Sequence, residues 1–524
     1  MQKKLLRISA LLTCISLCVC GCGKGKNSAV GNIDLSGECE PLTLPISKEP
    51  ITLRYWCGIY GQQPHMSENL VYQEISKRTN VNFEFINPPV GQDKEQFGLM
   101  LASKQLPDLI ERGSSEIYPG GVQKALDDKV YLRLNDYINK YAPNFKKILD
   151  ENPEIKKMLT LDTGDIPLFK SVKTTEEPPW TGPIYRQDLA EKLGIQPPET
   201  IDDWYNMLKA FKEKLNVKYP MSTAGVPGYG FSSGFNTGID FYQDNGKVKY
   251  APIEKEYKEI LKTLNRWYSE GLIDPEFAAR DEKSGETMKI NGDVAAWFGA
   301  YDKLDHYMSI ANTTNKEYKL GAGQYLVPQK GVKTKFIQKN YRVNEPSLAI
   351  TASTKYPKEA IKVVDYFYSH DGYLLFNYGI EGLTYTLDNN GEPYFTDFML
   401  NNPDGTPFTT LEYKYKRHSG PYLRNWAATP SVERPEIKKA METWEAAGTT
   451  DAALPLLSFT AEESSEINTV MNNVNTYKDQ YVTKAIMGLE SIDDFDKYTE
   501  KLKSFGIEKV IQHYNEALER YNKR

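Results

Sequence analysis

Aromatic side chains gather in parts of this sequence with the composition of turns, where a role in core packing is awkward. These residues are Trp56, Tyr60, Trp180, Tyr229, Phe231, Tyr301, Tyr385 and Trp426. The 524-residue chain holds 35 tyrosines and 7 tryptophans, more than core packing usually requires. An aromatic ring can stack on an apolar ligand face while polar groups bind at its edge. The pattern predicts a ligand with apolar C–H faces and a rim of hydroxyl groups, as sugars have.

Three charged residues have the chemistry to bind hydroxyl groups, and two of them have a structural alternative. Asp108 follows a Leu-Pro pair at a predicted strand end, where it can contact a ligand or cap a turn or helix. Arg186 can bind hydroxyls or pair with Asp188. Glu381 lies in a glycine-flanked loop and is a candidate for hydroxyl contact.

Motifs of catalysis are missing from the sequence. There is no nucleophile elbow, no His-Glu-x-x-His zinc motif and no phosphate-binding loop. None of the five histidines is spaced as a metal ligand or a triad member. Residues 388–391 resemble the start of a calcium loop but lack its later acidic ligands, which favours a hairpin turn. With 70 acidic residues, composition alone does not exclude the carboxylate pair of a glycosidase. The motifs assign no catalytic residue, metal or cofactor, and at this point a glycosidase stays open beside a binding protein.

The elements that must position these groups follow an alternating order. Residues 51–56 alternate as a strand, a helix starts near Ser67, and residues 81–85 form a second strand. A helix over 97–102 and a strand near 106–110 follow, which predicts a mainly parallel sheet with helices on both faces. Ligands of such sheets lie beyond the carboxyl ends of the strands. Later, Thr200 and Asp203 predict a capped helix.

The two tryptophans of the helical stretch 201–267 differ from the loop aromatics. Trp204 and Trp267 follow helical periodicity, which predicts core positions. Helices dominate after a strand near 348–351, and the last one is expected over 507–521. Strands that leave and return between helix-rich blocks predict two lobes with several chain crossings.

The first residues carry a secretion signal. Basic residues precede an apolar run over 8–19, which is too short for a membrane span. The small residue before Cys22 resembles the bacterial lipobox, so we expect a signal peptide over 1–21, lipidation of Cys22 and a flexible tether over 22–47. An ordinary signal peptide with an incidental cysteine is the alternative. Lipidation of Cys22 would hold the body on the outer face of the cell membrane.

Charge and cysteine content narrow the class of protein. A net charge of −6 argues against a nucleic-acid partner. About 500 residues after the signal are too many for one core. Beyond the tether, no apolar run reaches the ~18 residues of a membrane span, which predicts a soluble body. Cys39 and Cys57 follow the proposed cleavage site, and whether they pair stays open.

Motifs across the body resemble the extracellular solute-binding proteins of the family 1 type, which capture substrates for ABC sugar importers. The closest resemblance is to the large Gram-positive branch that serves oligosaccharide uptake. The segments that match are 135–138, 141–144, 185–195, 198–205, 267–277, 292–297 and 493–521.

The resemblance implies a periplasmic-binding-protein-like α/β fold, with two lobes joined by a hinge and a ligand cleft between them. Lobe one would hold 48–168 plus 318–354, and lobe two 169–317 plus 355–524. Trp56, Trp180 and Asp108 would face the cleft, and Trp297, in the motif 292–297, would either stack on sugar or pack in the core.

The function implied is that of a monomeric, membrane-anchored receptor on the extracellular face. It would bind an oligosaccharide and deliver it to an ABC permease. A peptide-binding protein of the same fold and a sensory lipoprotein without transport are the alternatives. The sequence does not specify the sugar, its linkage or its length, or whether a structural ion is bound.

Overall fold

The alternating residues 51–57 form the strand around which the first sheet is built. β1 (Ile51–Cys57) pairs in parallel with β2 (Val81–Ile86) on one side and with β3 (Leu109–Glu111) on the other. The helices α1 (Leu70–Thr79) and α2 (Asp93–Ser103) connect these strands. The predicted order of strands and helices is confirmed. Leu53 and Tyr55 of β1 are fully buried, as expected for one face of an alternating strand.

Later parts of the chain complete this sheet. The strands of this sheet follow the order β14-β4-β11-β3-β1-β2. The strands added to the first three are β4 (Phe169–Lys173), β11 (Val343–Ile350) and β14 (Leu423–Arg424). β11 is antiparallel to both of its neighbours, β3 and β4. The sheet is therefore mixed: β11 runs opposite to its other five described strands, of which β1, β2 and β3 are the parallel strands predicted from the N-terminal order of elements.

A second sheet begins where the chain leaves β4. It has the order β10-β5-β9-β6, with β5 (Thr181–Arg186), β6 (Tyr219–Met221), β9 (Val294–Ala300) and β10 (Leu320–Ala322). Only residues 174–180 separate β4 from β5, so the chain passes directly from one sheet to the other. Thr181 pairs with Ala300, which places the carboxyl end of β9 beside this crossing.

The two sheets do not divide the chain at the predicted lobe boundaries, which stay a prediction. Of the range 318–354, expected in lobe one, β10 belongs to the second sheet and β11 to the first. β14, expected in lobe two, pairs with β4 in the first sheet.

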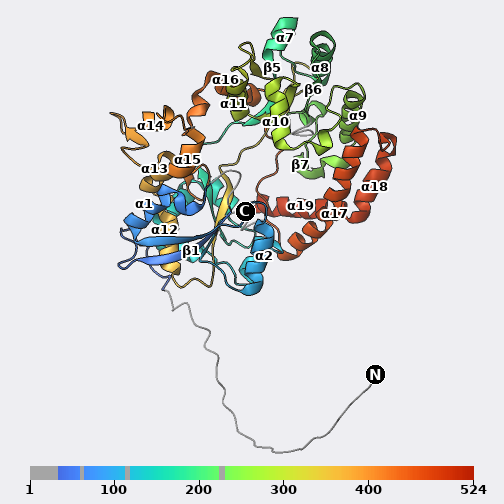
Figure 1. The fold of residues 1–524 in the computed structure, drawn as a ribbon. Coiled ribbons are helices and arrows are strands. Elements are labelled where there is room, and N and C mark those ends of the chain that lie inside the picture. The colour runs from blue at the N-terminus through green and yellow to red at the C-terminus, as the bar shows by residue number, and fades with distance from the viewer. Residues whose placement is uncertain (1–33, 59–63, 112–117, 223–229, 407) are drawn as a thin grey trace, which may run out of the picture. The chain divides into compact units, whose positions relative to one another are not determined.

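Helices cover the second sheet on both faces. α8 (Ile201–Leu215) begins with the predicted capping box of Thr200 and Asp203. It shares a core with α9 (Lys255–Ser269), α17 (Ala461–Ile486), α18 (Phe495–Phe505) and α19 (Ile507–Lys523), in which Trp204 and Trp267 are buried as predicted. In Figure 1 the C-terminal helices, in red, lie beside α9. A second core, which includes Trp297, Tyr307 and Trp444, packs further helices on the sheet.

The structure is a computed structural model that describes residues 34–58, 64–111, 118–222, 230–406 and 408–524. Two hairpins, β7 (Phe241–Asp244) with β8 (Lys247–Tyr250) and β12 (Tyr385–Leu387) with β13 (Pro393–Phe395), complete its strands. The turn of the second hairpin contains 388–391, as predicted. The remaining α-helices of the described residues are α3 (Gly121–Asp127), α4 (Asn135–Tyr141), α5 (Pro143–Glu151), α6 (Pro153–Leu159), α7 (Gln187–Leu193), α10 (Glu282–Asn291), α11 (Asp302–Ala311), α12 (Pro357–Tyr366), α13 (His370–Tyr378), α14 (Asp397–Leu400), α15 (Phe408–Tyr415) and α16 (Pro435–Ala446).

No helix within these ranges has both the length and the apolar character needed to cross a membrane.

A buried ion pair links the first sheet to the segment before β14. Arg417 Nη2 lies 2.5 Å from Glu111 Oε1 at the end of β3, and Arg417 Nη1 donates to the Tyr72 hydroxyl at 2.8 Å. Glu111 is fully buried and also accepts a hydrogen bond from Tyr55. Because the carboxylate is out of reach of water, its charge depends on Arg417 for compensation.

Replacing Arg417 by methionine should destabilise the fold by about 3–5 kcal/mol, because it strands the buried Glu111 carboxylate. Lys438→Met is the matched control: it breaks an ion pair with Glu433 whose side chains are 50% and 69% exposed, and should cost less than ~1 kcal/mol. Urea unfolding followed by circular dichroism measures both. An equal loss of unfolding free energy in the two variants would contradict this account of the ion pair between Arg417 and Glu111.

Candidate functional site

Three aromatic side chains lie where the chain passes between the sheets. Trp180 ends the crossing segment, and its carbonyl oxygen accepts a hydrogen bond from the Tyr301 amide at 2.9 Å. Trp426 donates from Nε1 to Thr175 Oγ1 at 3.0 Å, in the same crossing segment. Trp180 Nε1 donates to Asn340 Oδ1 at 3.1 Å. The protein thus binds the polar edge of each indole, and we call Trp180, Tyr301 and Trp426 the crossing aromatics.

The crossing aromatics remain partly exposed, unlike the other tryptophans. Trp180 is 39% exposed, whereas Trp56, Trp204, Trp267, Trp297 and Trp444 are each 4% exposed or less. Tyr301 and Trp426 are half-buried against the cluster that contains Val432 and Met441. Burial raises the pKa of Tyr301 to about 12, so its hydroxyl keeps its proton at neutral pH and can donate a hydrogen bond. The group can stack on apolar ligand faces and bind polar atoms.

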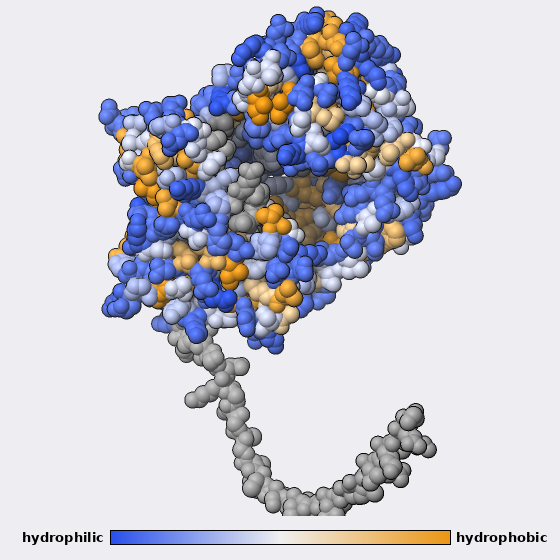
Figure 2. Space-filling view, viewed as in Figure 1, coloured by the Kyte–Doolittle hydropathy of each residue, from blue (hydrophilic) through white to orange (hydrophobic). Residues whose placement is uncertain are grey.

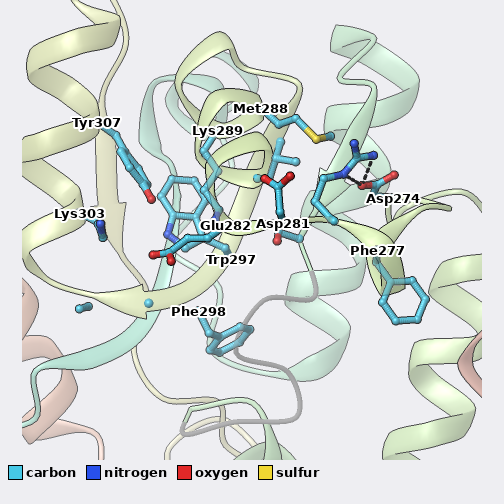
Figure 3. Close-up of a pocket in the computed structure, with 16 residues that line it drawn as sticks. Asp274, Phe277, Asp281, Glu282, Met288, Lys289, Trp297, Phe298, Lys303 and Tyr307 are labelled. Atoms are coloured by element: carbon cyan, nitrogen blue, oxygen red, sulfur yellow. Dashed lines mark hydrogen bonds and ion pairs between the residues drawn. The ribbon is translucent and has the colours of Figure 1, made fainter. Parts of the chain in front are cut away.

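A cavity of about 420 Å³ lies beside the carboxyl-terminal half of β9, close to the same crossing. It is enclosed by β9, α10, α11 and the segment 274–281 (Figure 3). Gly299, Ala300 and Lys303 line one side of the cavity. Because these residues flank Tyr301 in the sequence, this side of the cavity lies close to the crossing aromatics. Figure 2 shows one face of the unit Leu35–Arg524 hollowed at its centre, with polar residues along the rim.

Two hydrogen-bond donors of this cavity lack acceptors in the described chain. Trp297 is 2% exposed, and its Nε1 has no hydrogen-bond partner. Lys289 is 8% exposed, and its Nζ lies 5.8 Å from the centroid of the Trp297 ring. Burial lowers the pKa of Lys289. No carboxylate oxygen of the described residues lies within 4.0 Å of its ammonium group.

The other cationic groups lining the cavity are paired. Arg280 Nη2 contacts Asp274 Oδ2 at 2.7 Å, and Lys303 Nζ contacts Glu286 Oε1 at 3.1 Å. Trp297 Nε1 is a buried donor without an acceptor, which is costly, and an acceptor oxygen of a ligand would relieve that cost, as it would pair the Lys289 ammonium group. Lys289 and Trp297 therefore suit a ligand that brings hydroxyl, carbonyl or carboxylate oxygens.

Two predicted site aromatics are packed in hydrophobic cores. Trp56 belongs to β1 rather than to a turn, and it packs against Phe97 with ring centroids 6.3 Å apart. Phe231 is fully buried, with ring centroids 5.7 Å from both Trp267 and Phe298. α2 covers the ring of Trp56, and α9 with β9 covers the ring of Phe231, so neither belongs to the site.

The charged candidates have internal partners. Arg186 Nη2 lies 2.6 Å from Asp188 Oδ2, and its guanidinium stacks 4.1 Å from the centroid of the Tyr318 ring. Asp108 accepts hydrogen bonds from the Arg54 amide at 2.8 Å and from Thr354 Oγ1 at 2.6 Å. Arg186 therefore makes the ion pair that was its alternative to ligand binding, whereas Asp108 links β1 to Thr354 rather than capping a turn or helix.

The remaining candidates lie apart from the crossing. Tyr385 is 4% exposed and packs against Tyr378, whereas Glu381 is exposed at the base of the β12–β13 hairpin. Tyr60 and Tyr229 lie outside the described residues. Of the predicted set, the structure brings together Trp180 and Tyr301, and it places Trp297 in the adjoining cavity.

Lys289, Asn340 and Thr175 were not predicted. Lys289 lies on an ordinary polar helix, and the other two lie in loops, so no local sequence pattern distinguishes them from other polar residues.

Comparison with known proteins shows the family. The model of the bacterial extracellular solute-binding proteins matches residues 68–373, and the chain belongs to this family of binding proteins. The fold is the periplasmic-binding-protein-like α/β fold predicted from the sequence.

The individual relatives share less than a third of their residues with this chain over the matched regions. The fructooligosaccharide ABC transporter substrate-binding protein FusA of Streptococcus pneumoniae is 28% identical over 54% of this chain, and the match spans 55% of that protein. The polygalacturonan/rhamnogalacturonan-binding protein YtcQ of Bacillus subtilis is 22% identical over 89% of this chain and 91% of its own. The structure of S. pneumoniae FusA in complex with kestose is 22% identical, covers 90% of this chain and 100% of its own, and has a TM-score of 0.74.

Acrylamide should quench mainly the fluorescence of Trp180 and Trp426, since the other five indoles are buried. The double variant W180F/W426F should lose most of the fluorescence that acrylamide can quench. W204F, which removes a buried ring, should keep it. An accessible fraction that persists in the double variant would contradict this placement of the rings.

Proposed function

We propose that this protein is the substrate-binding lipoprotein of an ABC importer. It captures an oligosaccharide in the cleft between its two lobes and delivers it to the membrane permease. The observation that carries the proposal is the group of crossing aromatics, which lies beside a cavity with unpaired donors. Membership of the solute-binding family supports it, as do the oligosaccharide names of two relatives.

In the proposed mechanism the protein closes around its ligand. Trp180, Tyr301 and Trp426 stack on sugar faces, while Lys289 and Trp297 donate hydrogen bonds from the second-sheet side. A ligand that contacts both lobes favours the closed state by the difference in its affinity for the two states. The crossing segment 174–180, between β4 and β5, is where such a hinge motion takes place.

We further propose that the chain has no enzymatic activity and works as a monomer without nucleic acid. Its two lobes are built around the two sheets, so that relative to the boundaries predicted from the sequence β4 and β14 belong to lobe one and β10 to lobe two. A lipid on Cys22, after cleavage of 1–21, holds it on the extracellular face of the membrane through the tether 22–47. The basic and apolar start of the chain supports the anchor.

A thermal-shift screen tests the ligand class with neutral oligosaccharides, acidic oligosaccharides, simple sugars and short peptides. A ligand that binds only the folded state raises the unfolding temperature by mass action. We expect stabilisation by one oligosaccharide series. Stabilisation by peptides alone would replace the sugar assignment, and no response to any probe would favour the sensory alternative.

Trp180→Ala and Trp426→Ala should each weaken binding of the identified oligosaccharide about fivefold, because a stacked ring contributes roughly 1 kcal/mol. Tyr394→Ala is the matched control, since this tyrosine is 54% exposed on the β12–β13 hairpin. Isothermal titration calorimetry measures all three. Unchanged affinity in both tryptophan variants would remove the crossing aromatics from the site.

Cys22→Ser should abolish incorporation of a palmitate analogue and release the protein from the membrane fraction, because it removes the thiol that carries the lipid. Cys39→Ser is the control, since it changes the half-buried cysteine that follows the cleavage site. Retention of the label in Cys22→Ser would refute this anchor.

A further inference from the structure

A histidine at the interface of two C-terminal helices has one ring nitrogen paired and the other unpaired. His513 of α19 is 6% exposed, and its Nε2 lies 2.8 Å from Glu466 Oε2 of α17. An ionised carboxylate can only accept a hydrogen bond, so Nε2 carries the hydrogen. In the neutral imidazole, Nδ1 then presents a lone pair to its surroundings.

The Nδ1 atom faces two carboxylates at distances too long for hydrogen bonds. It lies 3.9 Å from Glu463 Oε1 and 3.7 Å from Glu516 Oε2, and it has no hydrogen-bond partner. One ligand atom from each of the three residues lies within 4.8 Å of the others. A lone pair directed at two carboxylate oxygens is repulsive unless a proton or a metal cation lies between them.

We propose that Glu463, His513 and Glu516 bind a divalent transition-metal cation such as Zn²⁺ or Mn²⁺. Metal bonds of roughly 2.0–2.2 Å to nitrogen and oxygen let one ion bridge atoms up to ~4 Å apart. Imidazole favours Zn²⁺ over Mg²⁺ and Ca²⁺, and the two carboxylates also suit Mn²⁺. Glu516, whose side chain is 43% exposed, has room for the small rotation that completes the site.

The surroundings of these residues support a built site. The Nε2 hydrogen bond to Glu466 orients the imidazole, as carboxylates commonly do for metal-binding histidines. Gln512 donates to Glu516 Oε1 at 2.7 Å, which leaves Oε2 directed at His513. Arg520 holds Glu463 through two hydrogen bonds of 3.0 and 2.7 Å. Lys509 also acts electrostatically on Glu516, so three carboxylates face one guanidinium and one ammonium group.

The position of the site predicts what the cation does. Arg520 also donates to Asp162 at 2.6 Å, in the turn that precedes β4 of the first sheet. A cation that ties α17 to α19 would therefore strengthen a contact between the C-terminal helices and the first-sheet half. The proposed metal is structural and does not depend on the identity of the transported ligand.

The test uses tag-free protein that has been dialysed against a chelator. Titration calorimetry with ZnCl₂ and with MnCl₂ should show one site per chain for at least one of them, and the same metal should raise the unfolding temperature. His513→Gln and Glu516→Gln should weaken binding at least tenfold and abolish the thermal shift. His306→Gln is the matched control, because His306 is 49% exposed and 3.8 Å from Glu286.

Circular dichroism establishes that each variant is folded, and Glu516→Gln provides the decisive comparison, since its side chain is half exposed. Absence of binding by the wild type, or equal binding by the wild type and both site variants, would overturn the proposal. Loss of binding in His306→Gln as well would also overturn it, because the metal would then bind surface histidines in general.

Discussion

The structure depends on how tightly the chain is held where it passes between the sheets. Residues 174–180 run beside a second crossing segment that leads into β11. Gln338 Oε1 accepts hydrogen bonds from the amides of Trp180 and Thr181, and Asn340 Nδ2 donates to the carbonyl oxygens of Glu177 and Pro178. Lys173 forms a buried ion pair with Glu177. Side-chain amides thus satisfy backbone groups that have no strand partner, as buried polar groups require.

This arrangement places the candidate site. Because β5 starts immediately after the crossing and pairs with β9, the carboxyl end of β9 must lie there as well. Tyr301 follows β9, and Trp426 follows β14 from the first sheet. Residues separated by more than 200 positions therefore meet at one point because two strand ends and one crossing converge. The cavity with Lys289 and Trp297 extends from the same strand end.

Local patterns predicted the elements well where a short segment contains all the interactions involved. The capping box of α8 needs only Thr200 and Asp203, and the parallel strands β1 to β3 follow from alternation and connecting helices. The site was predicted less completely. Trp56 and Phe231 were expected in turns, but whether a ring is covered depends on helices that pack over it from elsewhere in the chain. Lys289 became notable only because its surroundings lack a carboxylate partner.

The sequence by itself determined the class of fold, the family and the supply of aromatic side chains outside helical stripes, because periodicity, caps and motifs are local properties. Tertiary structure decided which rings stay exposed, which charges stay unpaired and which distant groups converge. His513 illustrates the difference. Glu516 lies three residues after it on the same helix, but Glu463 and Glu466 lie about 50 residues earlier and reach its ring only because α19 packs on α17. Burial and convergence depend on contacts between distant segments, and no local pattern encodes them.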